Sequence, residues 1–153
     1  MESSNNSNYN IYLDANVLIS FIESNDENIS ELFSLFMKNN KIKIYVSPFS
    51  IMETLDIKQE HKYFLKKVAE GIPLKRILSK RRERDLTKED LAEIFTKIKN
   101  KLKTQNLEWF YFPENSEWWK LALDIVRDTN ITSSDAIHLA QAINMSCSLL
   151  VTD

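Results

Sequence analysis

Carboxylates stand at several places where a short apolar run ends or a helical pattern begins. Asp14 follows the apolar residues 11–13, which have the composition of a short buried strand. Glu53 comes soon after a second such run, Asp135 opens a late helical pattern, and Asp153 follows the last apolar run. Carboxylate oxygens are the ligands that Mg²⁺ and Mn²⁺ prefer. A divalent cation held by these acids can activate water and stabilise the transition state of phosphodiester cleavage.

Each acid also has a purely structural explanation. Asp14 or the nearby Asn16 can cap the following helix, since both residue types are favoured at that position by about 1 kcal/mol. Asp135 at a helix start complements the helix dipole, while Glu53 on an exposed face and Asp153 at the chain end need no function. The four acids together favour a cation site, because close carboxylates repel one another unless a cation relieves the repulsion.

Strands and helices are expected to alternate along the chain and so to position the acids. The apolar pattern predicts strands at 11–13, 42–46, 107–112 and 148–151, and helices at 17–22, 28–38, from 48, at 61–79 with a break at 71–73, at 87–103, from 116 and from 133. The expected first-turn and capping residues are Pro48, Thr87 with Asp90, Ser116, and Ser133 or Ser134. Alternating strands and helices imply a parallel sheet. Because parallel strands end on one side of a sheet, the four acids are expected to converge there.

Length and composition fit one soluble domain. The chain has 153 residues, 43% of them hydrophobic and 27% charged, and its single Gly and three Pro favour helices over many tight turns. We expect residues 1–9 to form a disordered polar tail and residues 10–153 to form a single domain. No apolar run approaches the roughly 20 residues that span a bilayer, and the tail lacks the apolar core of a signal peptide. We therefore expect a cytoplasmic protein without membrane contact, and a packed thiol at Cys147 rather than a nucleophile.

Positive charge is concentrated in the middle of the chain. Residues 58–103 hold 15 Lys and Arg against 7 Asp and Glu, whereas the whole chain has a net charge of −2. A basic segment beside an acidic remainder suggests a polyanion-binding surface next to a cation site. The densest basic run, which is the candidate polyanion contact, consists of Lys80, Arg81, Arg82 and Arg84. The alternative explanation for this run is a solvated helix end.

Four segments, taken in order, resemble the PIN-domain family of metal-dependent ribonucleases. They are residues 11–19 (IYLDANVLI), 46–55 (VSPFSIMETL), 134–142 (SDAIHLAQA) and 149–153 (LLVTD). The resemblance implies a three-layer α/β/α sandwich with a central parallel sheet. It also implies an acidic pocket for Mg²⁺ or Mn²⁺ and cleavage of RNA, which makes the basic run Lys80, Arg81, Arg82 and Arg84 the candidate RNA contact. The middle of the chain, at about 58–106, has no comparable motif and is expected to be a helical insertion.

The resemblance also assigns roles to single residues. Asp14, Glu53 and Asp135 match the family's metal-binding acids, and Asn16 matches a polar neighbour of the first acid. Thr152 matches a hydroxyl near the last acid. The family's fourth acid usually falls two residues after that Thr, so Asp153 departs from the pattern by one position and is its candidate substitute. His138 follows Asp135 by three residues, and a packed, hydrogen-bonded His is favoured over a metal ligand there.

The predicted function is therefore a metal-dependent endoribonuclease. Many small family members are VapC-type toxins, so the resemblance implies an antitoxin protein and a homodimer as partners beside RNA. One alternative is a non-catalytic PIN-like domain that binds RNA or acts as a scaffold. Another is a receiver-like or phosphatase-like domain with Asp14 as phosphoacceptor. The latter requires Asp-x-Asp, or a Lys after a later strand, whereas this chain has Asn16 and the pair Thr152 and Asp153.

Overall fold

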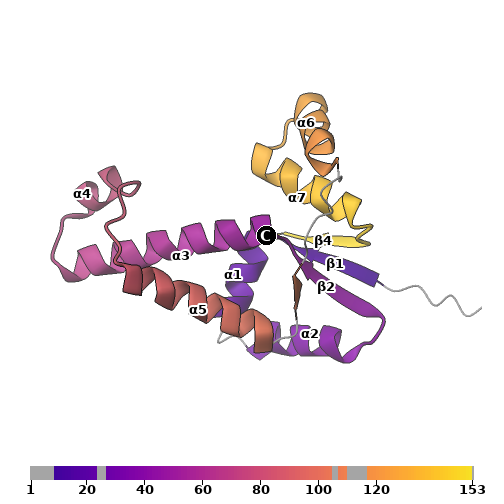
Figure 1. Ribbon diagram of the computed structural model, residues 1–153, viewed down its shortest axis with the longest axis horizontal. Coiled ribbons are helices and arrows are strands. Elements are labelled where there is room, and N and C mark those ends of the chain that lie inside the picture. The colour runs from indigo at the N-terminus through magenta and orange to yellow at the C-terminus, as the bar shows by residue number, and fades with distance from the viewer. Residues whose placement is uncertain (1–8, 24–26, 105–106, 110–116, 153) are drawn as a thin grey trace, which may run out of the picture. The chain divides into compact units, whose positions relative to one another are not determined.

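A computed structural model describes residues 9–23, 27–104, 107–109 and 117–152 (Figure 1). The chain forms two compact units. The first, here called the sheet unit, comprises residues up to Ile51 and from Leu107 onward, and the second, the helical unit, is Met52–Asn106. The helical unit contains the segment expected as an insertion at about 58–106, and it begins earlier, within a long helix.

The sheet unit is built on four parallel strands in the order β3-β2-β1-β4. The strands are β1 (Tyr9–Leu13), β2 (Ile42–Val46), β3 (Glu108–Trp109) and β4 (Leu149–Val151). Tyr12 and Leu13 in the central strand are at most 2% exposed, as expected where a parallel sheet is covered on both faces. The prediction of a parallel sheet is confirmed.

Helices cover both faces of this sheet. They are α1 (Ala15–Glu23), α2 (Glu27–Lys38), α6 (Trp118–Asp128) and α7 (Ser133–Asn144). In Figure 1, α6 and α7 lie on one side of the sheet and α1 and α2 on the other. Phe21 of α1 and Phe33 of α2 are both buried, and their ring centroids are 4.0 Å apart. The three-layer α/β/α prediction is confirmed.

The helical unit contains most of α3 (Pro48–Ala69), together with α4 (Leu74–Ser79) and α5 (Lys88–Thr104). Helix α3 begins at Pro48, as predicted, and runs without a break past His61. The predicted interruption follows it, where Gly71 has a φ of 74°, a conformation that favours glycine. Thr87 and Asp90 form the predicted capping box: each accepts the other's backbone N–H at 3.1 Å.

Several predicted boundaries differ from the structure. Tyr9, expected in the disordered tail, is the first residue of β1 and pairs with Ile42. The N-cap of α6 is Glu117 instead of Ser116, which lies outside the described residues, as do residues 1–8 and the expected strand residues 110–112. The cap of α7 is Thr132 instead of the predicted Ser133 or Ser134. No helix in the described segments is long and apolar enough to cross a membrane.

Candidate active site

Three strands of the sheet end at the same level. Leu13 at the end of β1 pairs with Val46 on one side and with Val151 on the other. The residues that leave the sheet next are therefore Asp14, Ser47 and Thr152. This is the carboxyl edge of a parallel sheet, the edge at which open α/β folds bind their ligands.

Asp14 caps helix α1 and remains a candidate cation ligand. Its Oδ1 accepts the N–H of Val17 at 2.9 Å, and its carbonyl accepts the N–H of Leu18 at 3.1 Å. The capping explanation weighed from the sequence is thus correct, but it engages only one carboxylate oxygen. Asp14 is 6% exposed, and within the described part of the chain no Lys, Arg or His forms an ion pair with it. A buried carboxylate with no basic partner is costly, and a bound cation would offset that cost.

Asp135 is held at the start of α7 by Thr132. The Thr132 hydroxyl donates to Asp135 Oδ2 at 2.7 Å and accepts the backbone N–H of Asp135 at 3.2 Å. This reciprocal arrangement anchors the carboxylate in the first turn of the helix. Asp135 is exposed, so its carboxylate is open to solvent while its backbone is fixed.

The other predicted site residues are Glu53, Asn16, Thr152 and Asp153, and the structure describes the first three of them. Glu53 is half-buried in α3, one turn after Ser50, and belongs to the helical unit. Asn16 is exposed in α1, Thr152 is exposed after β4, and Asp153 lies outside the described residues. Among the residues with described positions, no three His, Cys, Asp or Glu side chains form a group that could hold a metal ion. The convergence of the four acids stays a prediction.

The hydroxyl of Tyr12 forms a buried polar cluster behind this edge, which the sequence did not reveal. The Tyr12 hydroxyl oxygen lies 2.7 Å from Ser47 Oγ and 2.8 Å from Gln141 Oε1, and its single proton is donated to only one of them at a time. It also lies 3.2 Å from Ser50 Oγ and 2.9 Å from His138 Nδ1. All five residues are at most 5% exposed. The prediction of a packed, hydrogen-bonded His138 is confirmed.

The PIN domain family matches residues 11–153 of this chain. The chain belongs to the PIN domain family. Domains of this family are generally nucleases, and they typically use divalent metal ions. In the sheet unit of this PIN domain, Asp14 directly follows β1 and Asp135 lies in the first turn of α7. Their carboxylate oxygens suit a hard cation, and Asp14 has one oxygen outside its helix cap.

A solved structure supports the fold. This PIN domain is similar to the crystal structure of VapBC2 from Rickettsia felis bound to a DNA fragment from their promoter, with a TM-score of 0.59 and 15% sequence identity. The similarity covers 94% of this chain and 88% of that one. A search of curated proteins found no match.

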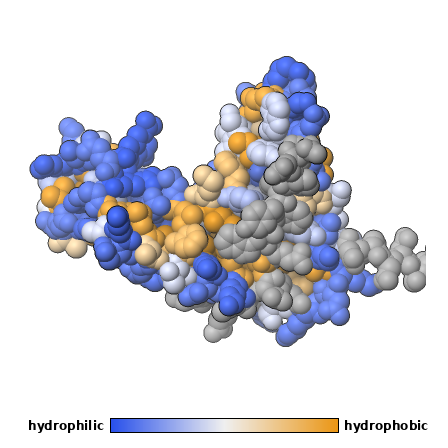
Figure 2. Space-filling view, in the orientation of Figure 1, coloured by the Kyte–Doolittle hydropathy of each residue, from blue (hydrophilic) through white to orange (hydrophobic). Residues whose placement is uncertain are grey.

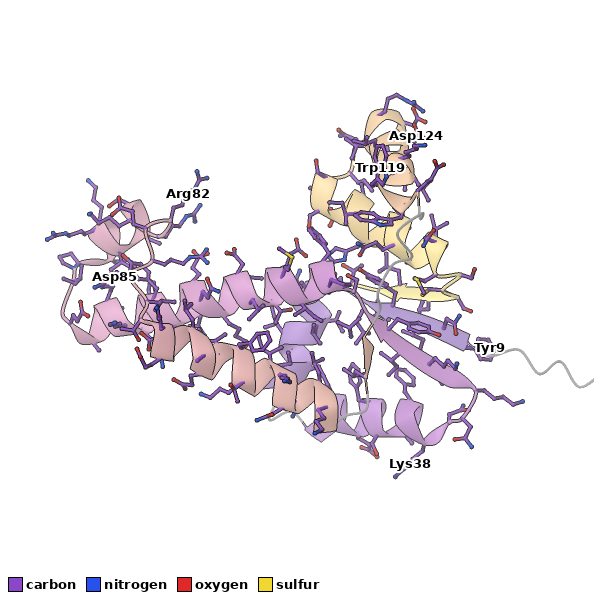
Figure 3. All side chains as sticks on the ribbon, viewed as in Figure 1. Tyr9, Lys38, Arg82, Asp85, Trp119 and Asp124 are labelled. Atoms are coloured by element: carbon purple, nitrogen blue, oxygen red, sulfur yellow. The ribbon has the colours of Figure 1, made fainter. Side chains whose placement is uncertain are left out.

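In the predicted basic run of this PIN domain, two side chains form ion pairs and two do not pair with a described residue. Arg84 donates to the Asp56 carboxylate at 2.6 Å, and Lys80 pairs with Glu83 at 3.0 Å. Arg81 and Arg82 are exposed in the turn after α4, a hydrophilic end of the helical unit in Figure 2. Arg82 extends away from the ribbon in Figure 3.

Proposed function

We propose that this PIN domain is a metal-dependent endoribonuclease. One observation carries the proposal: Asp14 is 6% exposed at the carboxyl edge of the sheet and has no ion-pair partner among the described residues. We assign Asp14, Glu53 and Asp135 as ligands of Mg²⁺ or Mn²⁺, with Asp153 as the fourth acid and with Asn16 and Thr152 in support. Family membership supports the nuclease class.

The roles of the protein residues follow from their positions. When bound, the cation would supply Lewis acidity toward water and the phosphodiester. Asp14 would present Oδ2 to it, because Oδ1 is held by the N–H of Val17. Asp135 would act from a fixed helix start, because Thr132 holds its Oδ2. Neither acid has to reorganise its backbone to bind, which favours a preformed site.

We propose that RNA phosphates contact the exposed end of the helical unit. The predicted RNA contacts were Lys80, Arg81, Arg82 and Arg84. Two of these four side chains, Lys80 and Arg84, already form ion pairs with carboxylates. A phosphate would have to displace Asp56 from Arg84 and Glu83 from Lys80. Arg81 and Arg82 form no ion pair with a described residue, so they are the primary contacts in this proposal.

We also propose a protein partner. The similar structure from Rickettsia felis contains VapBC2, and the VapC-type resemblance implies that an antitoxin restrains this nuclease. A homodimer is the oligomeric state that the resemblance suggests, and the cytoplasm is the proposed compartment. Co-expression with the product of a small neighbouring gene would test the partner, because an antitoxin should co-purify and suppress RNA cleavage.

Cleavage of a fluorescent single-stranded RNA with Mn²⁺, Mg²⁺ or EDTA tests the activity. The Asp14→Asn variant is the sharpest probe, because Asn also caps a helix and the variant should keep its fold. We expect metal-dependent cleavage by the unmodified protein and a loss of at least about 100-fold in kcat with Asp14→Asn or Asp135→Asn. RNA binding without cleavage by the unmodified protein would favour the non-catalytic alternative.

A further inference from the structure

The Tyr12 hydroxyl has more polar neighbours than a phenol can bond at one time. A phenol offers one proton and two lone pairs, so it makes about three hydrogen bonds. At least four polar side-chain atoms lie within 3.2 Å of the Tyr12 oxygen. Ser47 and Ser50 also bond each other at 3.1 Å. No buried side-chain polar atom of the described residues lacks a partner, so this cluster is fully satisfied.

The cluster joins three elements that leave or cover the sheet. Tyr12 lies in β1, two residues before Asp14. His138 and Gln141 lie in α7, and His138 follows Asp135 by one helical turn. Ring contacts add to the bonds: the His138 ring meets Tyr12 edge-on, with centroids 5.7 Å apart, and lies 5.0 Å from Phe49.

The two serines tie in the start of α3. Ser47 caps this helix by accepting the N–H of Ser50 at 3.0 Å. The Ser50 hydroxyl donates to the carbonyl of Leu13 at 3.0 Å, directly before Asp14. A single phenolic oxygen therefore connects β1, the first turn of α3 and α7.

We propose that Tyr12 is a positioning residue of the metal site, acting through His138 to hold Asp135 of α7 in register with Asp14 of β1. This inference rests on the proposed metal-dependent nuclease and names a part of its machinery. A buried, satisfied hydrogen-bond cluster fixes one arrangement of its elements more strictly than apolar packing does, because any shift leaves a buried polar group unpaired. Groups that orient metal ligands typically change metal affinity by about 10–100-fold when removed.

Tyr12→Phe tests this role, with Tyr63→Phe as its matched control. Both variants remove one hydroxyl from a buried tyrosine, but Tyr63 makes no hydrogen bond from its hydroxyl to a described residue. Mn²⁺ affinity is measured by calorimetric titration, and kcat and KM are measured with RNA. We expect Tyr12→Phe to weaken Mn²⁺ binding about 10-fold or more and to lower kcat, with KM for RNA unchanged. Tyr63→Phe should change none of these.

A second pair of variants tests whether the effect of Tyr12 on the metal site passes through the ring nitrogen of His138. Asn at position 138 can keep a polar atom near the place of Nδ1, whereas Leu cannot. His138→Asn should therefore retain Mn²⁺ affinity, and His138→Leu should behave as Tyr12→Phe does. Equal Mn²⁺ affinity in Tyr12→Phe and the unmodified protein would overturn the positioning role and leave the nuclease proposal intact. An unmodified protein that binds no Mn²⁺ would overturn both.

Discussion

The backbone N–H of Asp14 donates a hydrogen bond to the carbonyl of Val151 at 3.2 Å. This bond extends the β1–β4 ladder by one residue beyond the pair Leu13 and Val151. It fixes the first acid of the candidate site beside the end of the last strand. Thr152 therefore leaves the sheet next to Asp14.

Mn²⁺ should stabilise the folded protein. A ligand at about 100 times its dissociation constant adds about 2.7 kcal/mol to the free energy of unfolding, which corresponds to a rise in Tm of roughly 5–11 °C for a domain of this size. Differential scanning fluorimetry with excess Mn²⁺ measures this rise, and K⁺ at matched ionic strength is the control. Asp135→Asn should reduce the rise, while its metal-free Tm stays at or above that of the unmodified protein. An undiminished rise in that variant would remove Asp135 from the metal site.

Removing the Thr132 hydroxyl should destabilise α7. Thr132→Ala takes away the acceptor for the Asp135 N–H, which typically costs about 1 kcal/mol, or roughly 2–4 °C in Tm. The matched control is Ser133→Ala, one residue later, where no cap is lost. If the two variants melt at the same temperature, the cap contributes nothing measurable.

The periodic pattern of apolar residues was enough to predict the parallel sheet and most of its helices, whereas the three-layer α/β/α arrangement was predicted from the resemblance to the PIN-domain family. The parallel sheet, the start of α3 at Pro48 and the Thr87–Asp90 capping box all depend on local signals. The cap of α7 was predicted at Ser133 or Ser134 and lies at Thr132, because Ser and Thr are similar caps and three of them stand in a row.

Long-range polar partners could not be predicted from the pattern. Tyr12 and His138 are 126 positions apart, and the sequence marks Tyr12 only as an apolar strand residue. The sequence places Arg84 in a basic run, whereas the structure pairs it with Asp56, 28 positions earlier. Such pairs depend on how the elements pack, which residue spacing does not encode.

Arg81 and Arg82 should account for part of the salt dependence of RNA binding. For single strands, log K falls against log salt with a slope of about −0.7 per phosphate neutralised. The double variant Arg81→Ala, Arg82→Ala should make the slope shallower by about 1.4 if each residue contacts one phosphate. Fluorescence anisotropy with a labelled RNA between low and moderate salt measures the slope.

A charge-matched control accompanies this experiment. Lys99 and Lys103 are exposed on α5 and form no ion pair with a described residue. Replacing both by Ala removes the same net charge elsewhere on the helical unit. An equal change of slope in the two double variants would mean that net charge, rather than contact by Arg81 and Arg82, governs the affinity.

Acid should loosen the pairing of α3 with α5 in the helical unit. Hydrogen bonds from Lys62 and Lys97 lower the pKa of Glu93 to about 2 from its ordinary 4.5. Because the folded-state pKa is lowered, this stabilisation is fully present above about pH 4.5 and is lost as the pH falls toward 2. The backbone N–H of Thr87 lowers the pKa of Asp90 in the same direction. Helical circular dichroism during urea unfolding, repeated across this pH range, measures the loss.

Glu93→Gln should flatten that pH dependence, because Gln keeps the shape and cannot titrate. The control is Glu89→Gln on the same helix, since Glu89 forms no ion pair with a described residue. The Lys62 to Glu93 pair is exposed to solvent, so added salt should weaken its contribution in the unmodified protein. If Glu93→Gln and the unmodified protein lose stability in parallel from pH 4.5 to 2, the ion pair between Lys62 and Glu93 does not hold α3 against α5.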